Sequence, residues 1–376
     1  MTVAARAAVL SAMGAPRPYA DSRPLSIETV TLQPPGPGEV QVAIRAAGLC
    51  HSDLSVINGD RPRPLPMALG HEAAGVVEAL GEGVDDLAVG DHVVMVFMPS
   101  CGHCAPCAGG RPALCEPGAA ANGKGELLKG GRRIFREGQP IHHHLGCSAF
   151  AERAVVSRRS LVRVDPDLPF EEAALFGCAV LTGVGAVVNT AQVRAGQSVV
   201  VVGLGGVGLA AVMGALASGA APVVAVDLSE DKLALARSLG AVRTVNAADA
   251  DAVDQVRALT GGGADFAFEM AGSVRALDAA WRMTRRGGTT VTAGLPPPEA
   301  ALAVNVVSLV GEERTLKGSY IGTCVPSRDI PRYIALYRQG RLPVDRLMSG
   351  TIGLDQINSG FDRLADGEVV RLVVRF

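Results

Sequence analysis

Residues 198–208 decide the fold, and they read Ser-Val-Val-Val-Val-Gly-Leu-Gly-Gly-Val-Gly. The apolar run 198–202 predicts a buried β-strand, and the Ala, Leu, Val and Met residues that follow Gly208 predict a helix. A second apolar run, 223–226, ends in Asp227, nineteen residues beyond Gly208. This order of strand, glycine turn, helix, strand and acidic residue predicts a dinucleotide-binding site.

Each glycine of the turn has a predicted task. Gly203 permits the tight turn, Gly205 lets the backbone approach a pyrophosphate, and Gly208 lets the helix pack closely on the strand. Free N–H groups at the start of the helix then face the anion. Asp227 would accept hydrogen bonds from the adenosine ribose, which favours NAD over NADP. The alternative is a plain turn of a parallel sheet with a solvated aspartate. The predicted cofactor contacts are Gly203, Gly205, Gly206, Val207, Gly208 and Asp227.

The composition is that of a globular protein with a small-molecule partner. The chain has 376 residues, of which 48% are hydrophobic and 19% charged, so two domains are expected. A net charge of −2 gives no electrostatic reason to expect nucleic acid or an anionic membrane as partner. The apolar run 195–226 contains glycines and Pro222, which favours a buried sheet segment over a membrane span. The apolar piece 7–12 is too short for a signal peptide, so a cytoplasmic protein is expected.

The pattern of predicted strands and helices changes near residue 180. Before it, short β-like runs broken by Pro and Gly predict a β domain of barrel type. After it, strands and helices alternate, which predicts a parallel, doubly wound sheet. The closing strand 369–374 suggests that the C-terminal tail folds back onto the first domain. The predicted domains are 1–179 with 321–376, and 180–320; strands are expected near 243–246, 265–269 and 289–293, and helices over 230–239 and 329–338.

Four cysteines lie close together with the spacing Cys-x2-Cys-x2-Cys-x7-Cys. Glycines and a proline between them allow the sharp turns that would bring the thiolates around one tetrahedral Zn²⁺. Because all four coordination positions would be cysteine, this zinc would be structural. Free surface thiols or disulfides are the alternative. The predicted ligands are Cys101, Cys104, Cys107 and Cys115.

A second set of possible ligands is dispersed along the chain: Cys50, His71 and Cys178. A lone cysteine or histidine is more often part of the core than a ligand, and periodicity cannot show that these three meet. On spacing alone this second site is only a suggestion. Cys147 and Cys324 lack comparable polar neighbours and are interpreted as ordinary thiols.

Several ordered motifs together carry a family resemblance. They are Gly-Leu-Cys-His-Ser-Asp at 48–53, Gly-His-Glu-Ala-Ala-Gly at 70–75, the four-cysteine lobe, Gly177-Cys178 followed by Thr182-Gly183, the glycine turn and Asp227. Over nearly its whole length the sequence resembles the zinc-dependent alcohol dehydrogenases of the medium-chain dehydrogenase/reductase superfamily. The resemblance implies a GroES-like β-rich catalytic domain, a Rossmann domain and an active site in the cleft between them. It implies hydride transfer between an alcohol and NAD, with one catalytic and one structural zinc per chain.

The resemblance also assigns roles to single residues. The catalytic zinc would be held by Cys50, His71 and Cys178, and the cysteine at 178 favours the alcohol dehydrogenase branch because sugar-alcohol dehydrogenases carry a glutamate there. Solvated surface charges are the alternative for Lys232 and Arg371. The remaining implied roles are Asp53 orienting the zinc histidine, Glu72 behind the metal, Ser52 bonding the substrate oxygen, His51 and Arg371 at the pyrophosphate, Thr182 and Lys232 at the cofactor, and Phe97, His144 and Leu145 lining the substrate pocket.

The segment 116–146 resembles the long loop of the dimeric members of the family, so a homodimer is expected, with a tetramer or a solvated loop as alternatives. The histidine tract 142–144 resembles a metal-binding tract, but the resemblance places His144 at the substrate pocket instead. Where many relatives have a relay histidine for proton release, this chain has Ser55, which cannot act as a base near neutral pH. The expected proton route therefore leads through Ser52 and the ribose to water, with His51 as the alternative base.

Three functions are compatible with the sequence. The first is an NAD-dependent alcohol dehydrogenase that acts on an aromatic or longer alcohol. The second is the glutathione-dependent formaldehyde dehydrogenase branch, which would require a thiol adduct as substrate. The third is a catalytically silent nucleotide- or zinc-binding protein, against which the presence of all the predicted zinc ligands and of Ser52 argues. The physiological alcohol and the direction of the reaction in the cell are not encoded in the motifs.

Overall fold

The computed structural model describes residues 2–240 and 242–376, which form two compact units. The first unit contains the chain up to Cys178 together with Val325–Pro331 and Met348–Phe376. The second contains the described residues of Ala179–Cys324 and Arg332–Leu347. The prediction gave 1–179 and 321–376 to the first domain, whereas residue 179 and residues 321–324 and 332–347 belong to the second unit.

The first unit contains a six-stranded sheet with the order β8-β7-β2-β1-β4-β9. Alternate residues along these strands bury small and branched side chains, such as those of Val9 and Val30, which form the core of this sheet. The two short strands β4 and β9 run parallel, with Met67 opposite His142 and Ala68 opposite His143. The strands are β1 (Val3–Leu10), β2 (Leu25–Leu32), β4 (Met67–Ala68), β7 (Ile134–Arg136), β8 (Gln139–Pro140) and β9 (His142–His143).

A seven-stranded sheet completes the β structure of the first unit, with the order β11-β6-β5-β3-β19-β18 and β10 paired to β3. The C-terminal strand β19 lies antiparallel to β3, with Val373 opposite Gly48, so the predicted return of the tail to this unit is observed. The strands are β3 (Glu39–Gly48), β5 (Ala73–Leu80), β6 (His92–Met95), β10 (Arg153–Ser157), β11 (Leu161–Val164), β18 (Met348–Gly353) and β19 (Arg371–Arg375).

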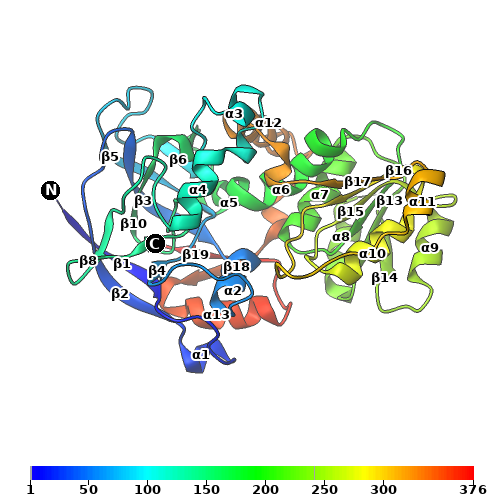
Figure 1. Cartoon of the computed structure of the whole chain (residues 1–376), viewed down its shortest axis with the longest axis horizontal. Coiled ribbons are helices and arrows are strands. Elements are labelled where there is room, and N and C mark those ends of the chain that lie inside the picture. The colour runs from blue at the N-terminus through cyan, green and yellow to red at the C-terminus, as the bar shows by residue number, and fades with distance from the viewer. Residues whose placement is uncertain (1, 241) are drawn as a thin grey trace. The chain divides into compact units, whose positions relative to one another are not determined.

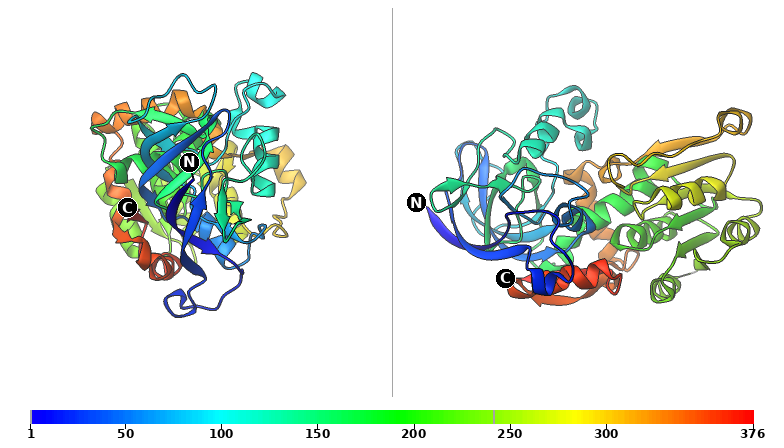
Figure 2. Two further views of the ribbon diagram at one scale, coloured as in Figure 1. Left: turned by 90° about the vertical axis from the view of Figure 1, so that its left-hand side faces the viewer. Right: turned by 60° about the horizontal axis from the view of Figure 1, so that its bottom comes forward.

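Short helices pack around these sheets. The N-terminal helix α1 lies against α13 near the C-terminus, where the backbone N–H of Tyr19 donates to Asp362 at 2.7 Å (Figure 2). The helix α12 contributes to both units, which divide after Pro331. The helices are α1 (Tyr19–Ser22), α2 (His51–Ile57), α3 (Ala105–Ala108), α4 (Glu116–Lys124), α5 (Phe170–Leu175), α12 (Pro326–Arg338) and α13 (Ile357–Ala365).

The second unit is built on a parallel six-stranded sheet with the order β14-β13-β12-β15-β16-β17. The chain reverses its direction across the sheet at β12, as in a doubly wound fold. Figure 1 labels β13 to β17 and the helices that connect the strands of this sheet. The strands are β12 (Val199–Val202), β13 (Val223–Asp227), β14 (Val242–Asn246), β15 (Ala264–Glu269), β16 (Thr284–Thr292) and β17 (Thr315–Gly318).

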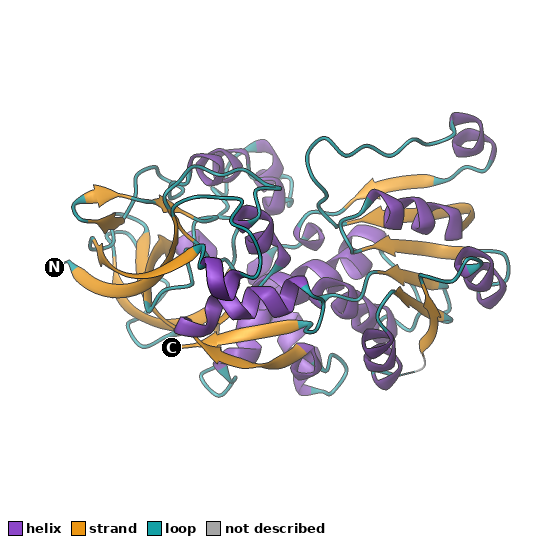
Figure 3. Ribbon diagram, turned by 90° about the horizontal axis from the view of Figure 1, so that it is seen from below, coloured by secondary structure: helices purple, strands orange, loops and turns teal. Residues whose placement is uncertain are grey.

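Helices cover both faces of this sheet. Val200 and Val224 point to the face that packs on Ala252 of α9 and Ala280 of α10. The alternate residues of the same strands therefore face α7, which contacts β12 and β13 on the other side. Figure 3 shows the strands of this unit between helices. The helices are α6 (Leu181–Gly185), α7 (Gly206–Ala217), α8 (Glu230–Ser238), α9 (Ala252–Leu259), α10 (Val274–Met283) and α11 (Val306–Gly311).

One helical stretch, Phe170–Ala191, is long and apolar enough to cross a membrane by composition alone. Because 89% of its most apolar window is buried inside the protein, it is a core helix. Within it α5 and α6 alternate with two π-helical segments, η3 (Phe176–Val180) and η4 (Ala186–Ala191). Such π-helical turns are frequent at functional sites.

Candidate metal and nucleotide sites

The dispersed residues Cys50, His71 and Cys178 meet in the first unit. Their ligand atoms all lie within 4.8 Å of one another, and all three side chains are buried. The Sγ atom of Cys178 lies 3.5 Å from Nε2 of His71. A tetrahedral zinc with Zn–S near 2.3 Å and Zn–N near 2.0–2.1 Å requires an S···N separation of about 3.5 Å. The three donors therefore fit a zinc ion with one further coordination position.

Local packing explains why these residues meet. Cys50 is the extended residue before α2, and His71 follows β4 after Gly70 at φ +96°. Cys178 lies in the π-helical segment η3. Its neighbour Gly177 packs against β6 so closely that a Cβ there would lie 2.2 Å from the carbonyl oxygen of Met95. Only glycine at 177 lets η3 approach far enough to bring Cys178 to His71.

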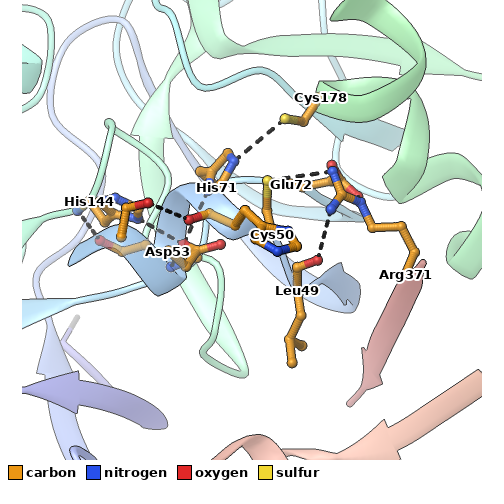
Figure 4. A network of polar contacts seen from close by, with 12 residues as sticks. Leu49, Cys50, Asp53, His71, Glu72, His144, Cys178 and Arg371 are labelled. Atoms are coloured by element: carbon orange, nitrogen blue, oxygen red, sulfur yellow. Dashed lines mark hydrogen bonds and ion pairs between the residues drawn. The ribbon is translucent and has the colours of Figure 1, made fainter. Parts of the chain in front are cut away.

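Asp53 lies on the first turn of α2, directly behind His71. Its carboxylate is fully buried, and Nδ1 of His71 lies 3.1 Å from Oδ1 (Figure 4). Burial raises the pKa of Asp53, but the charge of His71 and hydrogen bonding with His144 outweigh burial and lower the pKa. A carboxylate in this position holds the Nδ1 proton of His71, so that Nε2 is available to a metal.

Arg371 of β19 reaches the same site from the opposite side. Its guanidinium lies 3.2 Å from Oε1 of Glu72, donates to the carbonyl of Leu49 at 3.2 Å and contacts Sγ of Cys50 at 3.4 Å. It is 2% exposed, so it is not a solvated surface charge. Its expected contact with the cofactor pyrophosphate stays a prediction. Gly48 makes room for this arrangement, because a Cβ there would lie 2.3 Å from Oε1 of Glu72.

Interactions among the buried side chains shift the pKa values of the candidate metal ligands in different directions. The hydrogen bond between the two thiols lowers the pKa of Cys50 far below its usual value and raises that of Cys178. Burial lowers the pKa of His71, but the negative charges of Asp53 and Cys50 prevail and raise it well above its ordinary value. Burial raises the pKa of Glu72 to about 7, against the opposing effect of Arg371. Cys50 is therefore the ligand that is ready as a thiolate.

The four-cysteine set gathers in a separate lobe of the first unit. The ligand atoms of Cys101, Cys104, Cys107 and Cys115 lie within 4.8 Å of one another. The backbone N–H groups of Cys101 and Gly118 donate to Sγ of Cys115 at 3.2 and 3.3 Å, and that of Cys104 donates to Sγ of Cys101 at 3.3 Å. Such N–H donors favour the thiolate form. This donor set fits a closed, tetrahedral zinc site.

The glycine turn of the second unit has the geometry that a dinucleotide needs. Gly203 has φ +92°, and a Cβ there would lie 2.7 Å from the backbone nitrogen of Ala271. A Cβ on Gly208 would lie 1.8 Å from the carbonyl oxygen of Gly203. A Cβ on Gly205, in contrast, would meet none of the described atoms within 4 Å. Gly203 and Gly208 are thus needed by the fold, whereas Gly205 borders open space at the start of α7.

Asp227 lies at the end of β13, beside this turn. Its carboxylate accepts hydrogen bonds from the backbone N–H groups of Leu204 at 2.6 Å and Ser229 at 2.9 Å. It lines a cavity of about 470 Å³ at the carboxyl ends of the strands, together with Gly203 and residues that follow β14 and β15. This is the position where doubly wound sheets bind nucleotides. Lys232 is half-buried on α8, and Thr182 is buried on α6.

The other predicted site residues lie in the first unit. His51 is exposed and Ser52 half-buried, both on the first turn of α2. The ring of Phe97 stands edge-on to the His71 ring, with centroids 5.3 Å apart. Leu145 is buried at φ +52°. His144, expected at the substrate pocket, is 1% exposed, and its Nδ1 lies 3.1 Å from Oδ1 of Asp53. Sequence reasoning did not anticipate that contact, nor the contact of Arg371 with Cys50.

The fold, the two candidate metal sites and the glycine turn define a two-domain dehydrogenase that binds zinc and a nucleotide cofactor. Residues 36–166 match the alcohol dehydrogenase GroES-like domain, and residues 206–339 match the zinc-binding dehydrogenase domain. The chain belongs to the zinc-dependent alcohol dehydrogenases of the medium-chain dehydrogenase/reductase superfamily. The predicted fold class, GroES-like plus Rossmann, is thereby confirmed.

Three solved structures illustrate the similarity. An alcohol dehydrogenase zinc-binding domain protein from Burkholderia ambifaria shares 39% identity over 100% of both chains, with a TM-score of 0.94. The benzyl alcohol dehydrogenase of Acinetobacter calcoaceticus shares 32% identity over 100% of this chain and 99% of its own, with a TM-score of 0.92. A zinc-binding dehydrogenase described as putative, from Sinorhizobium meliloti 1021 and bound to NADP, shares 27% identity over 100% of both chains, with a TM-score of 0.80.

Proposed function

We propose that the protein is an NAD-dependent alcohol dehydrogenase that interconverts a primary or secondary alcohol and its aldehyde or ketone. The observation that carries this proposal is the convergence of Cys50, His71 and Cys178, with donor spacing that fits zinc, in a chain that also has the open glycine turn. Zinc held by these side chains would act as a Lewis acid toward the substrate oxygen and so favour hydride transfer to nicotinamide.

The residues around the metal ligands have supporting tasks. Ser52, one residue before Asp53 on α2, would bond the substrate oxygen and pass its proton on. Asp53 holds the His71 ring in the tautomer that leaves Nε2 free. The guanidinium of Arg371 balances the negative charge of Cys50 and Glu72. We assign His51 and Arg371 to the pyrophosphate and Thr182 and Lys232 to the rest of the cofactor.

NAD is the preferred cofactor in this proposal, although the relative from Sinorhizobium meliloti binds NADP. The carboxylate of Asp227 would accept a hydrogen bond from a free 2′-hydroxyl and would repel a 2′-phosphate. The lining of the adjoining cavity contains five aspartates and two arginines, so its charge balance is also unfavourable for an additional phosphate.

We propose two zinc ions per chain, one in each cysteine set. The four-cysteine lobe supplies all its own ligands, whereas the catalytic site depends on residues from three distant segments. Cys178→Ala should therefore remove one zinc per chain and leave the lobe loaded. Elemental analysis of the purified variant and wild type measures this directly, and one zinc or none in the wild type contradicts the assignment.

An aromatic alcohol is the substrate class that we favour. The benzyl alcohol dehydrogenase that shares 32% identity acts on such an alcohol by its name. Phe97 and Leu145, both assigned to the substrate pocket, are apolar. The thiol-adduct branch is the second candidate. Initial rates of NAD and NADP reduction are measured with benzyl, aliphatic and secondary alcohols and with formaldehyde plus glutathione. These rates distinguish an alcohol substrate from a thiol adduct. Absence of activity with every alcohol contradicts the proposed function.

We further propose a cytoplasmic homodimer. The reduced thiolates of both zinc sites require a reducing compartment. The edge strand β17 pairs only with β16 in the described part of the sheet, and its residues are exposed. The adjoining helix α11 exposes Val306, Val307 and Val310 at 68, 81 and 71%. Val307→Lys combined with Val310→Glu should convert the dimer to a monomer in light scattering.

A further inference from the structure

Three nitrogen atoms lie close to a single oxygen of Asp53, Oδ1. The backbone N–H of Gly70 donates to Oδ1 at 3.2 Å, Nδ1 of His71 lies 3.1 Å away, and Nδ1 of His144 lies 3.1 Å away (Figure 4). Asp53, His71 and His144 are each at most 1% exposed. Among the described residues no hydrogen-bond donor reaches the other oxygen, Oδ2. The orientation of this carboxylate therefore depends on the groups around Oδ1.

The backbone fixes the position of His144 relative to His71. The parallel pair β4 and β9 brings the segments that carry the two histidines side by side. Two hydrogen bonds extend this pairing, because the N–H groups of Ala149 and Phe150 donate to the carbonyls of Gly70 and Leu69, both at 3.0 Å. The N–H of His144 itself donates to Oγ of Ser148 at 2.9 Å. The His144 ring thus has little freedom to leave Asp53.

The chemistry of a buried imidazole decides what His144 can do there. Beside a carboxylate, Nδ1 of an imidazole carries a proton whether the ring is neutral or charged. The His144 and His71 rings stand edge-on, with centroids 5.6 Å apart and an interplanar angle of 87°. The Nδ1 atoms of both rings therefore lie 3.1 Å from one carboxylate oxygen, that of His71 in a hydrogen bond and that of His144 in a close polar contact.

We infer that His144 is a positioning residue of the catalytic metal site, which acts through Asp53 on the zinc ligand His71. Its ring, with Nδ1 3.1 Å from Oδ1, confines the carboxylate to the orientation that keeps the His71 ring aimed at Cys50 and Cys178. This inference rests on the proposed zinc function and extends it to a residue that touches neither metal nor cofactor. Groups that orient metal-ligating histidines typically change metal affinity or activity by about 10–100-fold.

The test compares two substitutions that differ in whether a polar N–H group faces Asp53. His144→Phe keeps a planar ring but removes the donor, whereas His144→Asn retains an N–H close to the position of Nδ1. The control variant is His142→Phe. It replaces a histidine of β9 whose ring contacts the carbonyl of Lys124 and not Asp53. Zinc-loaded enzymes are mixed with a chromogenic chelator, and the rate of zinc release is followed. Release in a Cys178→Ala background reports the four-cysteine lobe separately.

His144→Phe should release catalytic zinc about tenfold faster or more, while His144→Asn and His142→Phe should stay close to wild type. Visible spectra of the cobalt-substituted enzymes should shift for His144→Phe only, and lobe zinc and thermal unfolding confirm that each variant is folded. Wild-type release rates and spectra for His144→Phe overturn the inference. So does a zinc ion that Cys178→Ala retains in addition to the lobe zinc and that His144→Phe removes from it, because His144 would then be a ligand. If instead wild type and Cys178→Ala contain equal zinc, the proposed catalytic site itself fails.

Discussion

The Nε atom of Arg371 lies 3.2 Å from Oε1 of Glu72, and the two side chains are 2% and 0% exposed. The pair joins β19 to the residue after His71, a proposed zinc ligand, and the same guanidinium contacts Cys50. A buried carboxylate and a buried thiolate are thus balanced by one cation. Because removal of one partner leaves charge uncompensated in a low-dielectric interior, this pair is a sensitive part of the site.

Arg371→Leu should lower the free energy of unfolding by about 3–5 kcal/mol, because Glu72 and Cys50 lose their cation. Urea denaturation of the zinc-loaded protein measures the change. Glu72→Gln in the Arg371→Leu background should restore part of the loss, since neighbouring substitutions are not additive. A loss no larger than that of an ordinary surface substitution, about 0.5 kcal/mol, contradicts this role.

The two glycines of the turn should respond differently to alanine. Gly205→Ala should leave thermal stability near wild type but weaken NAD binding at least about tenfold, because the added methyl enters the space of a pyrophosphate. Gly208→Ala should destabilise the fold, because its Cβ would lie 1.8 Å from the carbonyl oxygen of Gly203. Calorimetry for NAD and thermal melts measure both. Unchanged NAD affinity in Gly205→Ala places the cofactor elsewhere.

Zinc binding at the catalytic site should strengthen as pH rises. The raised pKa values of His71 and Cys178 mean that both groups hold protons near neutral pH, and zinc must displace these protons. Lower pH therefore favours the protonated, metal-free form, and higher pH favours the complex. Chelator competition between pH 6 and 8, in the Cys178→Ala and wild-type proteins, isolates the catalytic site. An affinity that is constant over this range is incompatible with the assigned protonation states.

Proton release should limit turnover near neutral pH, because Ser55 occupies the place of a relay histidine. In the structure its hydroxyl donates to the carbonyl of His51 at 2.9 Å, so it closes a helical turn and relays no proton. Ser55→His, or imidazole buffer added to wild type, should raise kcat near pH 7, because general base help typically contributes about 10²-fold or more where it operates. If His51→Gln removes the pH dependence and leaves NAD affinity unchanged, His51 is the base instead.

Local patterns predicted the parts of this molecule that are continuous in sequence. The valine run 199–202 and the turn after it are such parts, because strand, glycine and helix follow one another directly. The helix predicted over 230–239 is observed as Glu230–Ser238. The strand predicted near 289–293 begins earlier, at Thr284, because the chain between Thr284 and Thr289 bulges against β15.

Contacts between residues far apart in the chain could not be predicted from sequence patterns. The dispersed ligands could be assembled only by resemblance, because nothing in the spacing from His71 to Cys178 predicts a 3.5 Å approach. The contact of His144 with Asp53 depends on the pairing of two-residue strands, which leave no periodic signal. Arg371 lies in the predicted closing strand, and the sequence alone left a solvated charge open as the alternative, because its partners Leu49 and Cys50 are more than three hundred residues away.

The spacing of the two ligand sets implies an order of metal loading during synthesis. The four-cysteine lobe is complete once residue 115 has left the ribosome, and a nascent chain could close it around zinc before any sheet of this unit is finished. The other site needs Cys178 and then β19, whose guanidinium neutralises Cys50. If both proposed sites bind zinc, a cell short of zinc would accumulate chains that hold zinc at the lobe but lack it at the proposed catalytic site.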